Sequence, residues 1–320
     1  ADVVAVVAGL AGLDGAVATP ADDAQALDAH PGPEAEVARI AQASGFQSLR
    51  RFNAAFAESY RMSPSRLRRA GMDNGTAPET AALQATLSFR EPLARAALLR
   101  FLAQRAVPGV EAVDLEAQCV RRTVRAGLLG PGHGPGWIEL AFAPGRAQVR
   151  LRASDALVAA SGRLLAGVRR WFDLDADPVA IEAALADIAP PLPGLRLPGG
   201  VDAFELAVRA VLGQQVTVAA ARTLARRVVE RFGAPIVTPW PGLDRTFPAP
   251  DVLARAGASA LGELGIIRSR AGAIVDLAVA WPEIEALLQP GAAPEPLVAR
   301  LRTVSGIGPW TAHYIAMRAL

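Results

Sequence analysis

Two glycines and two aromatic residues near the end of the chain are the residues best suited to chemistry. Residues 304–314 read VSGIGPWTAHY, in which Gly306 and Gly308 flank one isoleucine. Glycine permits positive φ at both ends of such a turn, and a helix that begins at Pro309 exposes the unpaired N–H groups of its first turn. This bend suits a phosphate, although the same glycines also fit a plain connection between two helices. The expected phosphate contacts are Gly306, Ile307, Gly308 and Thr311.

The aromatic pair after the glycines has two interpretations. Trp310 and Tyr314 are four residues apart and therefore share one face of the expected helix. Large rings at this spacing commonly pack into a core. They also form the stacking pockets that hold bases turned out of a duplex, where a cationic alkylated purine gains cation–π attraction. The spacing alone leaves both interpretations open.

The composition excludes several classes of protein. The chain has 320 residues, 52% of them hydrophobic, which leaves room for two or three domains with buried cores. All 33 basic residues are arginine, which suits phosphate contacts and is also typical of a GC-rich genome. The single Cys119 excludes a disulfide framework and a four-cysteine iron–sulfur cluster within this chain. A single cysteine is typical of a reducing cytosol, and no apolar run is long enough to span a bilayer, so we expect a cytoplasmic protein with no membrane partner. We also expect a monomer.

Charge divides the N-terminal part of the chain at about Val37. Residues 1–36 hold seven acidic residues and no arginine, whereas residues 37–70 hold seven arginines against one glutamate. The acidic block has little periodicity, and we assign it no function. Residues 71–84 are small and polar, which predicts an interdomain linker.

A helix-turn-helix is expected in the basic block. Ser48 can cap a helix that carries Leu49, Phe52 and Phe56 on one face. The stretch 40–69 resembles the second helix-turn-helix of AraC-family transcription regulators in its G-F-x-S-x-x-x-F-x-x-x-F and S-P-S-x-x-R spacings. The alternative is a small three-helix domain with a solvated basic face. The side chains expected to contact DNA are Gln47, Ser48, Arg50, Arg51 and Asn53.

The rest of the chain divides into a mixed part, residues 85–195, and a helical part, residues 196–320. Asp202 and Glu205 have the spacing of a capping box, and Gly213 ends the helix that they begin. In the mixed part, strands are predicted at 119–127, 136–145 and 147–154, and helices at 92–106, 155–170 and 178–188. In the helical part, further helices are predicted at 216–232, 251–257, 259–264, 269–280 and 294–303.

Two long stretches resemble one family. Residues 301–318, LRTVSGIGPWTAHYIAMR, resemble the helix-hairpin-helix of DNA glycosylases, and residues 194–221 resemble the bacterial, alkylation-inducible 3-methyladenine DNA glycosylases. The resemblance runs from about Leu87 to Leu320, and a regulator module ahead of it is similar to the Ada-like fusions of the bacterial alkylation response. The implied fold is α+β and mostly α: an N-terminal helix-turn-helix bundle, a small domain of antiparallel sheet and helices, and an all-α helix-hairpin-helix domain that is incomplete.

The resemblance implies a role for particular residues. The base pocket would be lined by Trp310, Tyr314, Phe101 and Gln214. Gln215 would be the wedge that enters the gap left by the flipped base, at a place where an apolar residue is more usual. No cofactor is required, but the hairpin carbonyls of Arg302, Val304 and Ile307 would hold a structural monovalent cation, Na or K. The partner would be double-stranded DNA that contains alkylated bases, which places the protein at the nucleoid.

The chemistry expected of this family is hydrolysis of the N-glycosidic bond. Glycosylases that also cut the backbone use a lysine two positions after the second hairpin glycine, where this chain has Trp310. The resemblance therefore implies a monofunctional enzyme in which a carboxylate stabilises an oxocarbenium-like sugar. That aspartate is expected about twenty residues after the hairpin, beyond Leu320, so we name no catalytic residue and expect a chain truncated at both ends. Asp276 and Glu283 are expected to be solvated, and Glu205 to be a cap.

The sequence therefore predicts a repair glycosylase for alkylated purines of the 3-methyladenine type, fused to a DNA-binding regulator module. The alternative is a non-catalytic DNA-binding regulator or lesion sensor of the alkylation response. A third possibility, a lyase of the iron–sulfur type, conflicts with the absence of lysine and of cysteines other than Cys119.

Overall fold

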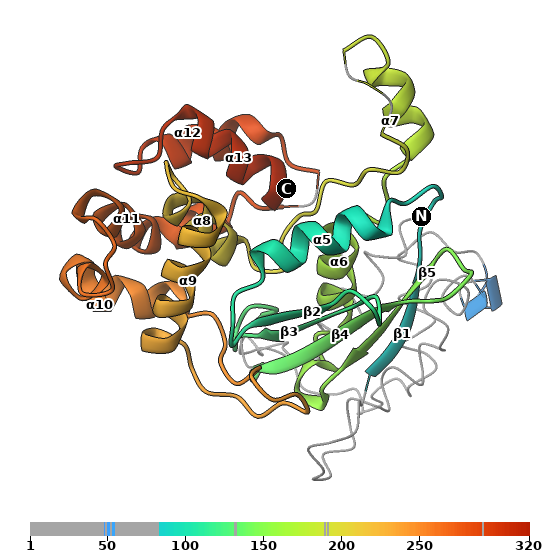
Figure 1. The fold of residues 1–320 in the computed structure, drawn as a ribbon, viewed down its shortest axis with the longest axis horizontal. Coiled ribbons are helices and arrows are strands. Elements are labelled where there is room, and N and C mark those ends of the chain that lie inside the picture. Colours follow the sequence, from blue (N-terminus) through green and yellow to red (C-terminus); the bar gives the residue numbers. More distant parts are fainter. Residues whose placement is uncertain are drawn as a thin grey trace, which may run out of the picture.

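The computed structural model describes residues 48, 50–51, 53–54, 83–130, 133–188, 190, 192–289 and 291–320. Figure 1 shows helices α8 to α13 on one side of the molecule and the sheet on the other, with α5 between them. Each side has its own buried hydrophobic core. The described part is thus an α+β structure, and α5 of the sheet half contacts α9 of the helical half.

An antiparallel sheet forms the first half. Within the described residues its strands follow the order β1-β5-β4-β3-β2, and each pair of neighbours is antiparallel. The strands are β1 (Leu83–Ser88), β2 (Glu111–Asp114), β3 (Cys119–Val124), β4 (Gly136–Phe142) and β5 (Gln148–Ala153). The expected hairpin between the last two strands is present, with Gly145 at φ 62° in its turn. Strands β1 and β2 were not predicted, and β1 begins inside the range 71–84 that was expected to be a linker.

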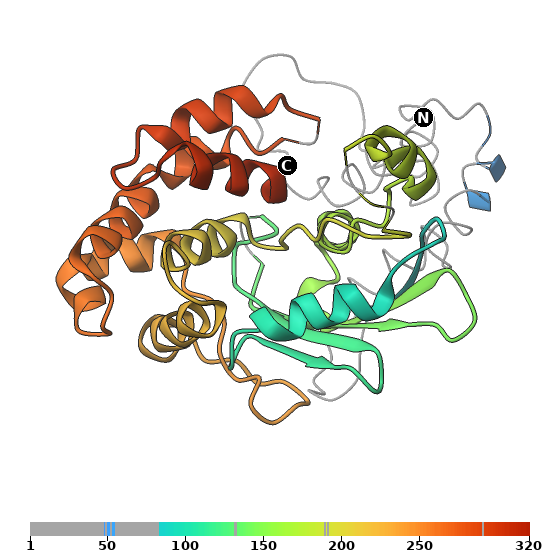
Figure 2. The same ribbon diagram turned by 45° about the horizontal axis from the view of Figure 1, so that its top comes forward.

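Helices α5 (Arg95–Arg105) and α6 (Ser161–Trp171) pack on the sheet. A short 3-10 turn, η1 (Asp155–Leu157), precedes α6, so the single helix predicted at 155–170 is divided in two. Helix α7 (Pro178–Leu185) projects away from both halves in Figures 1 and 2, and Asp177 caps it by accepting the Ala180 amide. A long connection, residues 192–202, then leads from α7 to the helical half.

The helical half is built around α8 (Ala203–Leu212), which packs against α11 and α13. Its other helices are α9 (Val218–Phe232), α10 (Pro250–Gly262), α11 (Arg268–Glu285), α12 (Pro294–Arg302) and α13 (Pro309–Ala319). The predicted break between helices near residue 257 is confirmed, because Gly257 has φ 74° inside α10. The end predicted for α11 at residue 280 is wrong: the helix continues past Pro282 to Glu285.

The start of α8 confirms one expectation and corrects another. Asp202 caps the helix, as predicted, by accepting hydrogen bonds from the amides of Phe204 and Glu205. The Glu205 carboxylate does not turn back to the cap. It is buried, with 2% of its surface exposed, and it binds the guanidinium groups of Arg122 and Arg209. A buried carboxylate is stabilised more by a positively charged partner than by a hydrogen bond from a helix amide, and Arg122 is such a partner.

The predicted helix-turn-helix lies almost entirely outside the described residues. Gln47 and the ranges 1–36 and 71–82 also lie outside them. Of the expected DNA contacts, Arg50 and Arg51 are helical and exposed, Asn53 is helical and half-buried, and Ser48 precedes them. Among the described residues, no helix is long and apolar enough to cross a membrane.

Candidate nucleic-acid interface

The glycine hairpin joins the end of α12 at Arg302 to the start of α13 at Pro309. Gly306 has φ 80°, and a Cβ placed on it would lie 2.9 Å from the Cβ of Ala273 on α11. Gly308 corrects the expectation of positive φ at both glycines, because its φ is −79° and its ψ 174°. An added Cβ at Gly308 would meet no atom within 4 Å. Gly306 is thus required by the turn itself, whereas the fold leaves space at Gly308.

This difference predicts opposite outcomes for two alanine substitutions. Gly306→Ala is expected to lower the free energy of unfolding by about 1–2 kcal/mol, because a side chain is strained at positive φ and approaches Ala273. Gly308→Ala should change that free energy by less than about 0.5 kcal/mol. It should nevertheless weaken binding to duplex DNA if a phosphate approaches the uncovered backbone. Urea unfolding and DNA-binding titrations measure the two effects separately, and equal stability losses in both variants would contradict the account.

The start of α13 offers free hydrogen-bond donors. Within the described part of the chain, the backbone amides of Gly308, Trp310 and Thr311 donate no hydrogen bond, while the Gly308 carbonyl accepts from Ala312. Gly306 and Gly308 are exposed, and Ile307 between them is buried. The helix dipole adds positive potential at this end. The hairpin can therefore receive a phosphate through its main chain, as the sequence predicted for an anion site.

Gln214 ties the hairpin to the connection between α8 and α9. Its side-chain amide donates to the Gly306 carbonyl at 3.0 Å and to the Thr311 hydroxyl at 3.1 Å. The Thr311 side chain is buried by this contact, so only its backbone amide is available to a phosphate. Gln214 was expected at the mouth of a base pocket, and here it supports the hairpin beside that pocket. Its neighbour Gln215 is exposed and has φ 52°, a conformation that is uncommon for a residue with a side chain.

Of the two interpretations of the aromatic pair, packing in the core is wrong for Trp310. The rings of Trp310 and Tyr314 are stacked, with centroids 5.3 Å apart and planes 9° apart. Trp310 is 72% exposed, so it is not part of the core, whereas Tyr314 is half-buried against it. An indole that is this exposed and already parallel to a neighbouring ring is a platform on which a planar base can stack.

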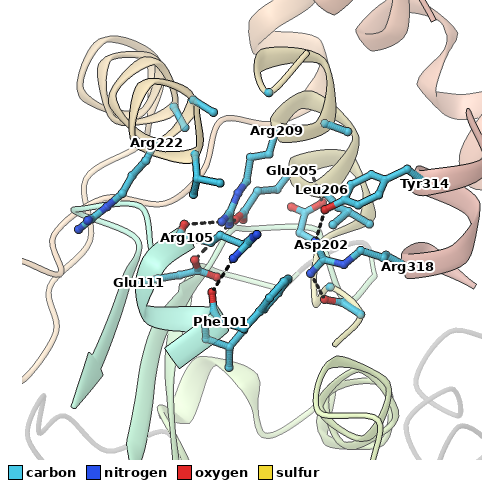
Figure 3. A pocket seen from close by; sticks show the side chains of 18 of the residues that line it. Phe101, Arg105, Glu111, Asp202, Glu205, Leu206, Arg209, Arg222, Tyr314 and Arg318 are labelled. Atoms are coloured by element: carbon cyan, nitrogen blue, oxygen red, sulfur yellow. Dashed lines mark hydrogen bonds and ion pairs between the residues drawn. The ribbon is translucent and has the colours of Figure 1, made fainter. Parts of the chain in front are cut away.

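A cavity of about 290 Å³ opens between the two halves of the molecule, beside this pair. Phe101 of α5 lines it together with Trp310 and Tyr314, so the three aromatic residues named from the sequence share one site. Figure 3 shows Phe101 of α5 and Tyr314 of α13 on two sides of the same space. Other lining residues were not predicted: Arg105, Glu111, Arg122, Asp202, Glu205, Arg209, Arg222 and Arg318. These eight charged residues have no common local sequence pattern, because they come from different parts of the chain: α5, β2, β3, α8, α9 and α13.

Four of these residues form a buried ion network between the two halves. Arg122 of β3 binds Glu111 at 2.9 Å and Glu205 at 2.7 Å, and Arg209 binds the same two carboxylates at 3.1 and 2.7 Å. Burial opposes ionisation of Glu205, but the charges of Arg122 and Arg209 outweigh it and hold the pKa of its carboxyl below the usual value. Beside the network, Asp202 is paired with Arg125. The three carboxylates of the cavity are thus all occupied.

The expected cation site consists of the hairpin carbonyls of Arg302, Val304 and Ile307. The Val304 carbonyl already accepts the Ile307 amide at 3.1 Å, which leaves that oxygen one further lone pair for a cation. The described residues contain no group of three or more His, Cys, Asp or Glu side chains that could hold a metal ion.

Comparison with known proteins identifies the class first. Residues 84–202 match the AlkA N-terminal domain, and residues 208–301 match the HhH-GPD superfamily of base excision DNA repair proteins. The helical half up to residue 301 is therefore that of the HhH-GPD superfamily of base excision DNA repair proteins. The chain is 36% identical to DNA-3-methyladenine glycosylase 2 of Escherichia coli over 233 residues, which are 73% of this chain and 79% of that protein. It belongs to the family of 3-methyladenine DNA glycosylases.

Two further relatives and two solved structures are similar to the chain. A probable bifunctional transcriptional activator/DNA repair enzyme AlkA of Mycobacterium tuberculosis is 36% identical over 292 residues, which are 88% of this chain and 56% of the relative. The chain thus spans little more than half of that protein. A DNA-3-methyladenine glycosylase of Bacillus subtilis is 34% identical over 164 residues, 48% of this chain and 53% of that protein.

The two solved structures share the fold at low sequence identity. A 3-methyladenine DNA-glycosylase from Archaeoglobus fulgidus has a TM-score of 0.57 at 19% identity. The matched region covers 73% of this chain and 79% of the Archaeoglobus chain. A structure of MBOgg1 in complex with a low affinity DNA ligand has a TM-score of 0.54 at 15% identity and covers 77% and 78%.

Proposed function

We propose that the protein excises alkylated purines, of the 3-methyladenine type, from double-stranded DNA by hydrolysing the N-glycosidic bond. One observation supports this most strongly: the exposed indole of Trp310 lies parallel to Tyr314 at a cavity that Phe101 also lines, next to a hairpin with free amides. A flipped base needs a stacking pocket, and the strand that carries it needs a phosphate contact nearby. The hairpin amides and the Trp310–Tyr314 pair lie next to one another at the start of α13.

Each expected site residue has its own role in this reaction. Of the four residues expected to bind the DNA backbone, Gly306, Gly308 and Thr311 do so through their amides, whereas the Ile307 amide donates to the Val304 carbonyl. A monovalent cation at the carbonyls of Arg302, Val304 and Ile307 reinforces the phosphate contact. Gln215, exposed between α8 and α9, fills the gap in the duplex, while Gln214 holds the hairpin in place. The damaged base stacks on Trp310, Tyr314 and Phe101. An alkylated base is a good leaving group, so water attacks the sugar without a general acid.

The carboxylates of the cavity are not candidates for the group that stabilises the sugar cation. Glu111 and Glu205 are held by Arg122 and Arg209, and Asp202 is held by Arg125. We therefore assign a catalytic role to none of these three carboxylates. The second candidate function is a lesion sensor that binds damaged DNA without cleaving the bond. We also infer, from the resemblance of residues 40–69 and from the name of the mycobacterial relative, that the module at 37–70 binds DNA as a regulator.

One assay separates the two functions. A duplex that has been methylated is incubated with the complete gene product, and free 3-methyladenine is measured together with the abasic sites left in the strand. The glycosylase releases base and leaves the strand intact until alkali is added, because no lysine is available to cut it. Damage-dependent binding with no released base would favour the sensor instead. We infer a monomer that works in the cytoplasm and needs no organic cofactor.

A further inference from the structure

The start of α11 exposes a large apolar side chain. Ile267, the residue before the helix, is 54% exposed, and its backbone is extended with φ −60° and ψ 148°. Its neighbour Ile266 is buried in the core of the helical half. Ile266 therefore fixes the turn between α10 and α11, while Ile267 lies at the surface of that turn and adds little to the core.

Three contacts hold this turn next to the loop that carries Gln215. Arg270, in the first turn of α11, donates a hydrogen bond to the Gln214 carbonyl. Gly306 of the hairpin packs so closely on α11 that an added Cβ would lie 2.9 Å from the Cβ of Ala273. Gln214 in turn donates to the Gly306 carbonyl at 3.0 Å. The hairpin, the Gln215 loop after α8 and the start of α11 are thus tied together, and α11 lies beside α8 in Figure 1.

Two arginines flank Ile267. Arg268 follows it and is exposed, and Arg227 of α9 donates to the Leu264 carbonyl of the same turn at 2.9 Å. Across the part of the chain that the structure describes, neither guanidinium lies within 4.0 Å of an acidic side chain. Basic side chains around an exposed apolar one suit a duplex, because the arginines bind phosphates and the apolar side chain enters the base stack.

We propose that Ile267 is a second wedge, which enters the strand complementary to the damaged one, while Gln215 fills the gap that the flipped base leaves. This inference rests on the proposed function. The damaged strand occupies the hairpin and the cavity, and Ile267 belongs to neither, so the strand within its reach is the complementary one.

The two wedge residues differ in chemistry. The amide of Gln215 can hydrogen-bond the base that has lost its partner, but a polar side chain gains little from entering a stack of bases. The isoleucine removes its apolar surface from water when it separates two stacked bases. Arg268 and Arg227 then hold the phosphates of the same strand on either side of the separated step.

The test measures binding and base stacking without turnover. A duplex carries one 7-methylguanine on a 2′-fluoro sugar, which prevents cleavage, and 2-aminopurine in the complementary strand, next to the base that faces the lesion. The fluorescence of 2-aminopurine rises when the base loses its stacked neighbour. The damaged strand alone and an undamaged duplex are the comparison probes.

Affinity and fluorescence are measured for the complete gene product, for Ile267→Ala and for Val279→Ala. Val279 is 66% exposed further along the same helix, so it is the matched control for the loss of an exposed apolar side chain from α11. The wild type is expected to bind the damaged duplex more tightly than the undamaged one and to raise the fluorescence severalfold. Ile267→Ala should remove most of that rise and weaken binding of the damaged duplex roughly tenfold. It should leave binding of the single strand unchanged, and Val279→Ala should behave as the wild type does.

Two kinds of result would overturn the inference. One is a fluorescence rise that Ile267→Ala retains or that the wild type never shows. The other is an Ile267→Ala variant that binds the single strand as poorly as it binds the duplex, since that would indicate a structural role. Failure of the proposed function is a separate result: the wild type would bind the damaged duplex no more tightly than the undamaged one, and the inference would fail with it.

Discussion

Replacing Trp310 with alanine in the complete gene product should lower the single-turnover rate of 3-methyladenine release by roughly tenfold to a hundredfold, because stacking on an aromatic side chain contributes about 1–3 kcal/mol per base. The indole is 72% exposed, so its removal leaves the core and the fold intact. Its ring is also parallel to Tyr314, which would lose its partner and become free to tilt. The effect should therefore appear in catalysis and lesion affinity, with little change in the urea midpoint.

A matched control comes from the same helix. His313 is exposed on α13 and does not line the cavity, so His313→Ala should excise at the wild-type rate. A Trp310→Ala variant that releases base as fast as the wild type would contradict the assignment of this ring. So would an equal loss in both variants, since that would indicate damage to α13 in general.

Replacing Glu205 with glutamine should have the largest effect on stability. The substitution keeps the shape but removes the charge that Arg122 and Arg209 share, and it leaves the Arg122 guanidinium buried without full compensation. Breaking a buried ion pair in this way costs about 3–5 kcal/mol. Chemical unfolding measures it, and Glu230→Gln provides the comparison, because the Glu230 pair with Arg226 is exposed and should contribute less than about 1 kcal/mol.

The same network predicts a pH dependence with a definite sign. Because the folded protein holds the pKa of Glu205 below its unfolded value of about 4.3, the unfolded chain binds the proton more readily. The stabilisation from Glu205 is therefore fully present above about pH 4.3 and is lost as the pH falls through the lower folded pKa. Unfolding measured at a series of acid pH values should show a steeper loss for the wild type than for Glu205→Gln. Identical slopes would show that Glu205 is not a charged partner.

Regular elements with a strong period could be predicted from the sequence, and the elements that depend on tertiary contacts could not. The cap at Asp202 and the break at Gly213 are local and were found. Strands β1 and β2 are the two edges of the sheet, and β2 has four half-buried residues with no alternation. Strand β1 does alternate, with Leu83, Ala85 and Leu87 buried, so its period was present in the sequence and was missed. Their places are decided by pairing with β5 and β3.

The site shows the same division. The hairpin and its aromatic residues lie within a few positions of one another, so spacing was sufficient to name Trp310 and Tyr314. Arg122, by contrast, sits in a strand pattern that suggests a solvent-facing residue, and its partner Glu205 is 83 positions away. An ion pair between residues of two domains produces no local sequence pattern. For this reason Glu205 was predicted to be a helix cap.

We infer that the cavity beside Trp310 and Tyr314 receives a base extruded from DNA. A crystal structure of the full chain with a duplex that carries a 2′-fluoro-stabilised damaged nucleotide tests it most directly. The account predicts the damaged base stacked on Trp310 within reach of Phe101 and Arg105, with a phosphate of the same strand on the amides of Gly308, Trp310 and Thr311. A bound duplex in which that base stays paired in the helix, with the cavity empty and the hairpin facing solvent, would contradict it.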